Sequence, residues 1–233
     1  MGLALRVAMA VLLALFAVQA RAQMTGSATF VSDYRFRGVS LSDDRPSAQL
    51  SFDYDWPASG WYAGGMMANV RADSRHAAQL LGYAGYVHRL NADISWEGGV
   101  RYSRFTGHES YAYAEAYTGL TFRQLVGRIY YAPSYFNGGV AVWYAEVNDS
   151  FALSGQWYAL AHAGCLRRAG NVTEYQASRF RSDFKAGIGF APPPWNFQLS
   201  WTTTRGAPDA AFDYPSAANA NRNAWVLSIS YAW

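Results

Sequence analysis

Charged side chains that recur at every second position are the first candidates for chemistry in this chain of 233 residues. Asp33, Arg35 and Arg37 follow this spacing, and Asp53 and Asp55 repeat it farther along. A period of two places such side chains on one face of a β-strand and the residues between them on the other face. The residues between them are aromatic, so each strand would have one charged and one apolar face. Carboxylates and guanidinium groups held this way can form ion pairs between strands or line a water-filled path.

Twelve charged residues fall on the polar face of such strands, and two interpretations of them stay open. In the first, the charges of residues 33–37 and 53–55 pair between strands, fix their register and plug the interior, because side chains fill small barrels. In the second, the charges border water and form a polar path, because unpaired charges away from water are costly. The seven acidic and five basic candidates for lining the lumen are Asp33, Arg35, Arg37, Asp53, Asp55, Glu97, Arg101, Glu115, Arg128, Glu146, Asp183 and Lys185.

The elements that would carry these residues are twelve segments of alternating apolar and polar residues. Most are close to the roughly 9–11 residues with which a tilted β-strand crosses a bilayer. An even number of strands is typical of single-chain bacterial outer-membrane barrels. The sequence therefore predicts an all-β protein, a transmembrane antiparallel β-barrel of about 12 strands. The segments are residues 27–37, 48–56, 61–70, 80–88, 93–103, 111–122, 126–131, 140–147, 157–164, 183–190, 197–204 and 225–233.

The connections between these segments alternate in length. One set is turn-like, as expected at the periplasmic end of a barrel, and within it we expect residues 147–156 to form the longest link. The other set is longer and more polar, and we expect it to lie outside the cell. The short set includes residues 57–60, 89–92, 123–125 and 191–196, and the long set includes residues 165–182 and 205–223.

The last segment carries Trp225, Leu227, Ile229, Tyr231 and Trp233 on one face. A transmembrane strand would expose this face to lipid, whereas the last strand of a soluble β-sandwich would bury it. A chain that ends on an aromatic residue resembles the signal that the barrel-assembly machinery reads on bacterial outer-membrane proteins. We therefore predict that Tyr231 and Trp233 act as an assembly signal in a closing strand.

The N-terminus predicts export. Arg6 precedes an apolar run that ends in Ala20-Arg21-Ala22, which is typical of a signal peptide cleaved after residue 22. The predicted organisation is a signal peptide over residues 1–22 and a barrel over residues 23–233. Without Arg6 and Arg21, 17 basic residues remain against 16 acidic ones, so the mature chain lacks the basic excess of a nucleic-acid-binding protein. Its aromatic content, 17%, is typical of a barrel in contact with outer-membrane lipid.

The histidines do not predict an enzyme. His76 and His108 fall in expected external loops, His88 at a turn and His162 within a strand, and none lies beside a recognisable nucleophile motif. Paired-cysteine and His-x-x-Glu-His spacings are absent from the sequence. We predict no catalytic residue, no cofactor and no metal site. A hydrolase that uses His162 is a minor alternative.

Several motifs resemble one proteobacterial outer-membrane family, the TorF-type porins. They are SDYRFRGVS at residues 32–40 with Arg45-Pro46, GWYAG at 60–64, YAEAY at 113–117, YYAPSYF at 130–136, YAE at 144–146 and AHAG at 161–164. The resemblance implies an outer-membrane barrel in a Gram-negative cell and a narrow passive channel for small hydrophilic solutes. A structural or adhesive barrel with a plugged lumen is the alternative, and the oligomeric state stays open.

Overall fold

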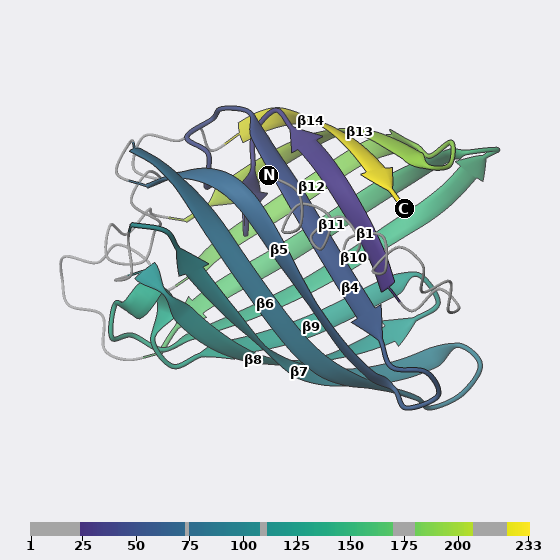
Figure 1. Ribbon diagram of the computed structural model, residues 1–233, viewed down its shortest axis with the longest axis horizontal. Helices are drawn as coiled ribbons and strands as arrows, with labels where there is room; N and C mark the ends of the chain where they lie inside the picture. Colours follow the sequence, from purple (N-terminus) through teal and green to yellow (C-terminus); the bar gives the residue numbers. More distant parts are fainter. Residues whose placement is uncertain (1–23, 73–74, 108–110, 170–179, 207–222) are drawn as a thin grey trace, which may run out of the picture.

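A computed structural model describes residues 24–72, 75–107, 111–169, 180–206 and 223–233 (Figure 1). Twelve long strands form one closed antiparallel barrel, in which each strand pairs with its neighbours in sequence and β1 pairs with both β4 and β14. The predicted twelve-stranded barrel is confirmed. Its strands are β1 (Met24–Val31), β4 (Ser47–Asp55), β5 (Trp61–Ala72), β6 (Arg75–Arg89), β7 (Ile94–Phe105), β8 (Tyr113–Phe122), β9 (Leu125–Ala132), β10 (Val142–Ser154), β11 (Trp157–Arg168), β12 (Phe180–Phe190), β13 (Trp195–Arg205) and β14 (Asn223–Ala232).

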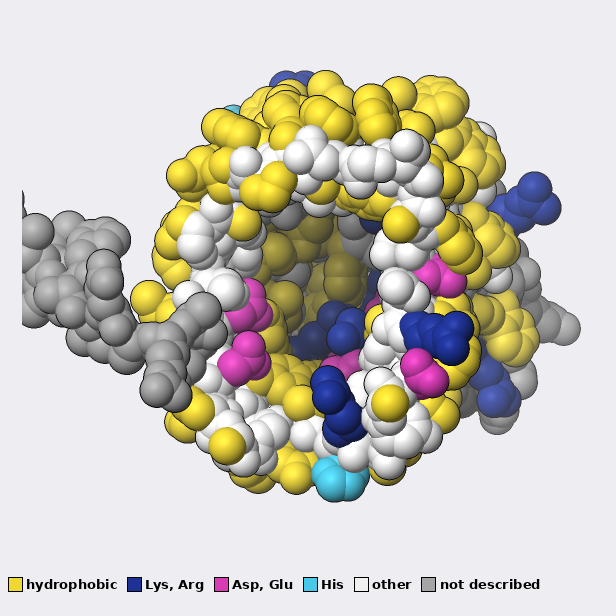
Figure 2. Space-filling model, turned by 90° about the vertical axis from the view of Figure 1, so that its right-hand side faces the viewer, with side chains coloured by type: hydrophobic (Ala, Val, Ile, Leu, Met, Phe, Trp, Pro, Cys, Tyr) yellow, Lys and Arg dark blue, Asp and Glu magenta, His cyan; other side chains and the backbone are white. Residues whose placement is uncertain are grey.

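Alternation along each strand gives the barrel an apolar exterior and a polar interior. In β14, Trp225 and Leu227 are exposed, whereas Val226 between them is buried. The same alternation around the wall covers the outside with large apolar side chains, and the end-on view shows them surrounding a hollow interior with charged residues (Figure 2). An apolar exterior of this kind is stable only against lipid. The outward orientation predicted for the aromatic face of the last strand is confirmed.

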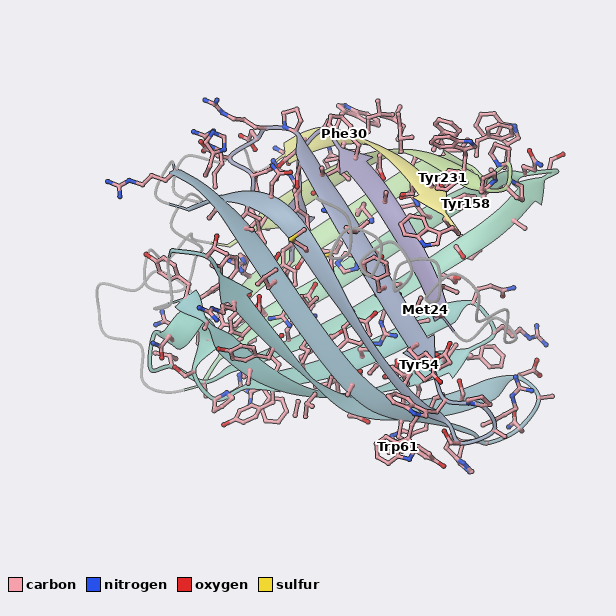
Figure 3. All side chains as sticks on the ribbon, viewed as in Figure 1. Met24, Phe30, Tyr54, Trp61, Tyr158 and Tyr231 are labelled. Carbon is pink, nitrogen blue, oxygen red and sulfur yellow. The ribbon has the colours of Figure 1, made fainter. Side chains whose placement is uncertain are left out.

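The first and last strands close the barrel. Ala28 of β1 lies opposite Tyr231 of β14, and the seam continues beyond the strand with two backbone hydrogen bonds between Gly26 and Trp233. Phe30 and Tyr231 lie on the outer surface near this seam (Figure 3). Closure gives every strand of the described barrel two neighbours, so the sheet has no free edge strand, as a spanning sheet in hydrocarbon requires.

The two ends of the barrel differ. At one end, here called the short-turn end, residues 56–60, 90–93, 123–124, 155–156 and 191–194 connect the strands, and β1 begins and β14 ends there. Exposed aromatic side chains gather at this end, among them Tyr54 and Trp61 (Figure 3). Such girdles mark the boundary between membrane and water. The opposite end, called the long-loop end, carries the connections after β1, β7, β9, β11 and β13.

The predicted long link over residues 147–156 is wrong. β10 continues to Ser154 and pairs with β11 almost to its end, so only Gly155 and Gln156 form the turn. Asp149 obscured the strand because it places a charge on the outward face. The outward apolar residues Phe151 and Leu153 continue the alternation beyond it.

The first predicted strand, residues 27–37, also ends too late. β1 ends at Val31, and residues 32–46, called the inward loop, turn into the barrel. The inward loop contains a hairpin of β2 (Arg35–Phe36) and β3 (Val39–Ser40). Its turn has positive φ angles at Arg37, 51°, and Gly38, 76°. Two consecutive positive φ angles are typical of a tight two-residue hairpin turn, which reverses the chain where we predicted a continuous strand.

The barrel interior near the long-loop end contains a hydrophobic core. Leu41 of the inward loop joins inward side chains such as Phe105 and Tyr144 in this core. Tyr135 and Phe136 join it from the β9–β10 connection, where η2 (Tyr135–Asn137) forms a short turn of 3₁₀ helix. The core therefore consists of two folded loops packed inside the wall. Among the described residues, no helix has the length and apolarity needed to span a membrane.

Candidate functional site

A cavity of about 340 Å³ lies inside the barrel, between the inward loop and the wall. The inward loop forms one side of it, and inward residues of β10 to β14 form most of the other. The view from the short-turn end shows the hollow interior with charged side chains at its sides and floor (Figure 2). Seven charged candidates line this cavity: Asp33, Arg35, Arg37, Arg101, Glu146, Asp183 and Lys185.

The inward loop crosses the lumen and is anchored on opposite walls. On one side, the Tyr34 hydroxyl donates to Gln79 Oε1 of β6 at 3.0 Å, and the Arg71 backbone N–H of β5 donates to the Leu41 carbonyl at 2.8 Å. On the other side, Thr204 Oγ1 of β13 donates to the Gly38 carbonyl at 2.7 Å. Burial raises the pKa of Tyr34 far above its usual value, so its phenol stays a donor. These hydrogen bonds fix the inward loop inside the lumen.

The tip of the inward loop holds a buried ion pair. Arg37 Nη2 lies 2.8 Å from Glu115 Oε1 of β8, and both side chains are nearly inaccessible. Among the described residues, Arg37 Nε and Nη1 have no hydrogen-bond partner. The guanidinium instead faces aromatic rings, with the Tyr144 centroid 4.2 Å away. Burial lowers the pKa of Arg37, but Glu115 and nearby tyrosines more than offset this, so the pKa is raised and the side chain stays charged.

Asp33 of the inward loop is neutralised within the loop. Asp33 Oδ2 lies 2.5 Å from Arg35 Nε, and Asp33 Oδ1 accepts hydrogen bonds from Ser40 and Ser42 at 2.6 and 3.2 Å. Arg35 also pairs with Asp44 at 2.9 Å. These contacts fix the shape of the hairpin from inside.

Of the two interpretations of the lumen charges, the ladder of ion pairs between residues 33–37 and 53–55 is therefore not what forms. The inward turn of the loop carries its charges away from β4. Asp53 of β4 instead accepts a hydrogen bond from the Tyr83 hydroxyl of β6. Asp55 lies exposed at the short-turn end.

The remaining wall charges form a second network on β7 to β9. Arg128 Nε lies 2.6 Å from Glu97 Oε1, and the Tyr62 hydroxyl donates to Glu97 Oε2 at 3.0 Å. Arg101 pairs with Glu115, the same carboxylate that binds Arg37. This network neutralises the β5–β9 side of the lumen.

Sequence reasoning missed the inward tyrosines. Their hydroxyls donate to the wall carboxylates, as Tyr130 does to Glu146 at 2.9 Å. Tyr144 and Glu146, two positions apart on one strand, already share a face in the sequence. The parity of these tyrosines could have identified them, but we assigned aromatic residues to the lipid face.

His162 lies in the lumen wall, and each of its two ring nitrogens has a hydrogen-bond partner. Its Nδ1 lies 2.7 Å from Asn148 Oδ1, and its Nε2 lies 2.7 Å from Asp183 Oδ1. The Tyr144 hydroxyl donates to both oxygens of Asp183 at 3.1 and 3.2 Å. Since both ring nitrogens face oxygen atoms, neither is directed at a serine hydroxyl that it could activate.

The other histidines form no site in the described residues. His76 lies near the start of β6 rather than in a loop, which corrects its predicted position, and His88 lies near the end of the same strand. The prediction for His108 falls outside the described residues. No group of three or more potential metal ligands gathers among the residues that the structure describes.

Comparison with solved structures finds outer-membrane porins of similar fold. The KdgM porin is 10% identical, with a TM-score of 0.55, and the match covers 90% of this chain and 99% of that chain. The NanC porin is 10% identical, with a TM-score of 0.59, and the match covers 89% and 98%. A further structure, described as the KdgM porin in complex with disordered oligogalacturonate, is 10% identical with a TM-score of 0.54, covering 90% and 99%. At this identity the likeness shows the fold alone.

Comparison by sequence finds one family and no curated protein. Residues 18–233 match the model of a family described as "Bacterial protein of unknown function (Gcw_chp)". No curated protein matches the chain. The family description contains no porin name, so the resemblance to TorF-type porins stays a prediction.

Proposed function

The chain belongs to the bacterial family Gcw_chp, and we propose that it is an outer-membrane barrel that acts as a narrow passive channel for small hydrophilic solutes. The observation that carries the proposal is the closed barrel of twelve strands, apolar outside and charged inside, with a cavity along its lumen. Charged groups facing a water-filled lumen lower the cost of moving a polar solute through the bilayer.

The inward loop would set the size limit of the channel. Its backbone crosses the lumen between the β5–β6 wall and Thr204 of β13, so solutes would pass beside it rather than through an open cylinder. The cavity, about 340 Å³, is at the small end of the range for ligand pockets. Tyrosine hydroxyls and amides at its walls suit hydroxylated solutes, and the KdgM structure described with oligogalacturonate makes sugars a reasonable first class to test.

The proposed orientation places the short-turn end in the periplasm and the long-loop end outside the cell. Export would depend on the signal peptide predicted over residues 1–22, which lies outside the described residues. Cell fractionation should recover the protein with the outer membrane, and sequencing of its N-terminus should begin at Gln23. Recovery in the soluble periplasmic fraction without detergent would contradict this location.

Osmotic swelling of liposomes tests the channel and its size limit together. Liposomes that contain the purified protein should swell in galactose and swell much more slowly in a tetrasaccharide, because only the smaller sugar would pass beside the inward loop. Liposomes without protein are the control. Equal swelling with and without protein in both sugars would remove the channel proposal.

A barrel with a plugged lumen, structural or adhesive, is the second candidate. The hydrophobic core between the inward loop and η2 favours it, because this core fills the interior near the long-loop end. The plugged barrel predicts no swelling in any sugar, together with stable insertion in the outer membrane.

A further inference from the structure

Lys185 is the only lysine in the chain, and it lies in the middle of β12 facing the lumen cavity. In the sheet it stands opposite His162 of β11 and Thr202 of β13, and both of these residues also line the cavity. The side chain is half-buried.

The acidic residues that line the cavity already have donors. Asp183 is bound by His162 and Tyr144, and Glu146 is bound by the Tyr130 hydroxyl. Asp33 is bound within the inward loop. These contacts leave each carboxylate with a close donor.

The basic residues of the cavity also have partners, except for one. Arg35 pairs with Asp33, and Arg37 and Arg101 share Glu115. Within the described part of the chain, Lys185 is the one charged residue of the cavity wall with no hydrogen bond or ion pair. Glu146 lines the same cavity and attracts this charge without forming an ion pair with it. The Lys185 ammonium group therefore faces the cavity with its hydrogen bonds free for an anion that enters the lumen.

The surroundings of Lys185 narrow the chemistry of that partner. Glu146 and Asp183 line the same cavity and would repel an ion of high negative charge. Neutral hydrogen-bonding side chains, among them Gln198, Ser200 and Thr202, stand on the adjacent strand and can bind hydroxyl groups. A solute with one carboxylate and several hydroxyls fits this combination better than a phosphate dianion.

We propose that Lys185 binds the carboxylate of a small, singly charged sugar acid in the lumen. The proposal rests on the proposed function in one respect only, since it names the class of solute that the channel would favour. The binding step itself does not require that the lumen be open at both ends.

Because Lys185 is the only lysine, amine acylation measures its accessibility directly. The folded wild-type protein in detergent is treated with acetic anhydride, and acetylated peptides are quantified by mass spectrometry. Galacturonate should slow the acetylation of Lys185 several-fold, whereas galactose, which lacks the carboxylate, should not. A lysine-containing reporter peptide added to the same solution is the control for reagent strength and should react equally under both conditions. Equal acetylation of Lys185 in both sugars would overturn the proposal.

A conductance experiment adds a second readout with matched variants. In planar bilayers, galacturonate should block the wild-type current, and Lys185→Met should raise the concentration needed for half block by about tenfold, equivalent to about 1.4 kcal/mol. Arg123→Glu, at an exposed position in the β8–β9 turn, is the control and should leave the block unchanged. An unchanged block in Lys185→Met would also overturn the proposal. Protection of Lys185 from acetylation together with silent bilayers would instead preserve the binding site and remove the channel.

Discussion

At the scale of single residues, burial decides what the ion pairs contribute. Arg37 and Glu115 are almost completely buried, whereas Arg123 and Asp93 form an exposed pair at 3.3 Å. An exposed pair is weakened by water and salt, and its net contribution is small. A buried pair contributes little relative to an apolar replacement, but the loss of one partner leaves an uncompensated charge.

Replacement of Glu115 by glutamine should therefore destabilise the barrel strongly. The change leaves both Arg37 and Arg101 without their carboxylate, and we expect the free energy of unfolding to fall by about 3–5 kcal/mol. Urea titration in detergent micelles, followed by tryptophan fluorescence, measures this change. Asp93→Asn is the matched control and should cost less than about 1 kcal/mol. Similar stabilities for the two variants would show that water reaches the Arg37 site.

At the scale of elements, the inward loop is held in place by a close approach at Gly38. A Cβ atom at this position would collide with Thr204 Oγ1 and Asp183 Cβ, and the φ angle of 76° disfavours any other residue. The β2–β3 hairpin thus reaches the opposite wall only because its tip is a glycine.

Substitution of Gly38 by alanine should displace the inward loop and widen the lumen. We expect a larger single-channel conductance and a lower free energy of unfolding, because the new Cβ atom has no room. Gly107→Ala is the control: its φ angle is 72°, and no atom lies within 4 Å of the position of a Cβ. That variant should carry only the backbone strain of about 1–2 kcal/mol and keep the wild-type conductance. Equal conductance in all three proteins would mean that the loop does not limit the channel.

The closing strand permits a test of the assembly signal. Trp233→Ser should reduce the folded protein in the outer membrane more than Ala232→Ser, as measured by heat-dependent mobility in gel electrophoresis. Trp233 also packs edge-on against Phe52, with ring centroids 6.0 Å apart, so a loss could be structural. Phe52→Ala separates the two causes because it removes this contact and leaves the C-terminus intact. A loss as large in Phe52→Ala as in Trp233→Ser would assign the effect to packing alone.

Period-two patterns predicted the strands well and the inward loop badly. Residues 48–56 lie in a strand whose bounds differ from the prediction by one residue at each end. The prediction succeeds here because the strand has an apolar environment on one face only, which is what its alternating sequence indicates. Residues 32–37 have the same alternation, but Arg37 adopts a positive φ angle and the chain reverses. Alternation reports which side chains share a face and carries no information on where a strand leaves the wall. The tertiary contacts of Gly38 and Arg37 decide that point.

At the scale of the whole molecule, the barrel places an apolar exterior around two kinds of interior. At the long-loop end the inward loop and η2 pack against the wall in a hydrophobic core, whereas the cavity extends beside the inward loop along the walls of β10 to β14. The sequence predicted charged lumen candidates but not their partners, because pairs such as Arg37 with Glu115 join residues far apart in the chain. Closure into a barrel brings them together.

Single-channel recording in planar bilayers tests the central claim most directly. The purified wild-type protein should produce discrete conductance steps of uniform size, and the steps should grow in proportion to salt concentration at high ionic strength. A narrow, aqueous lumen beside the inward loop requires this result. Bilayers that stay silent at high protein load, with insertion verified by protease protection, would contradict the channel and leave a plugged barrel.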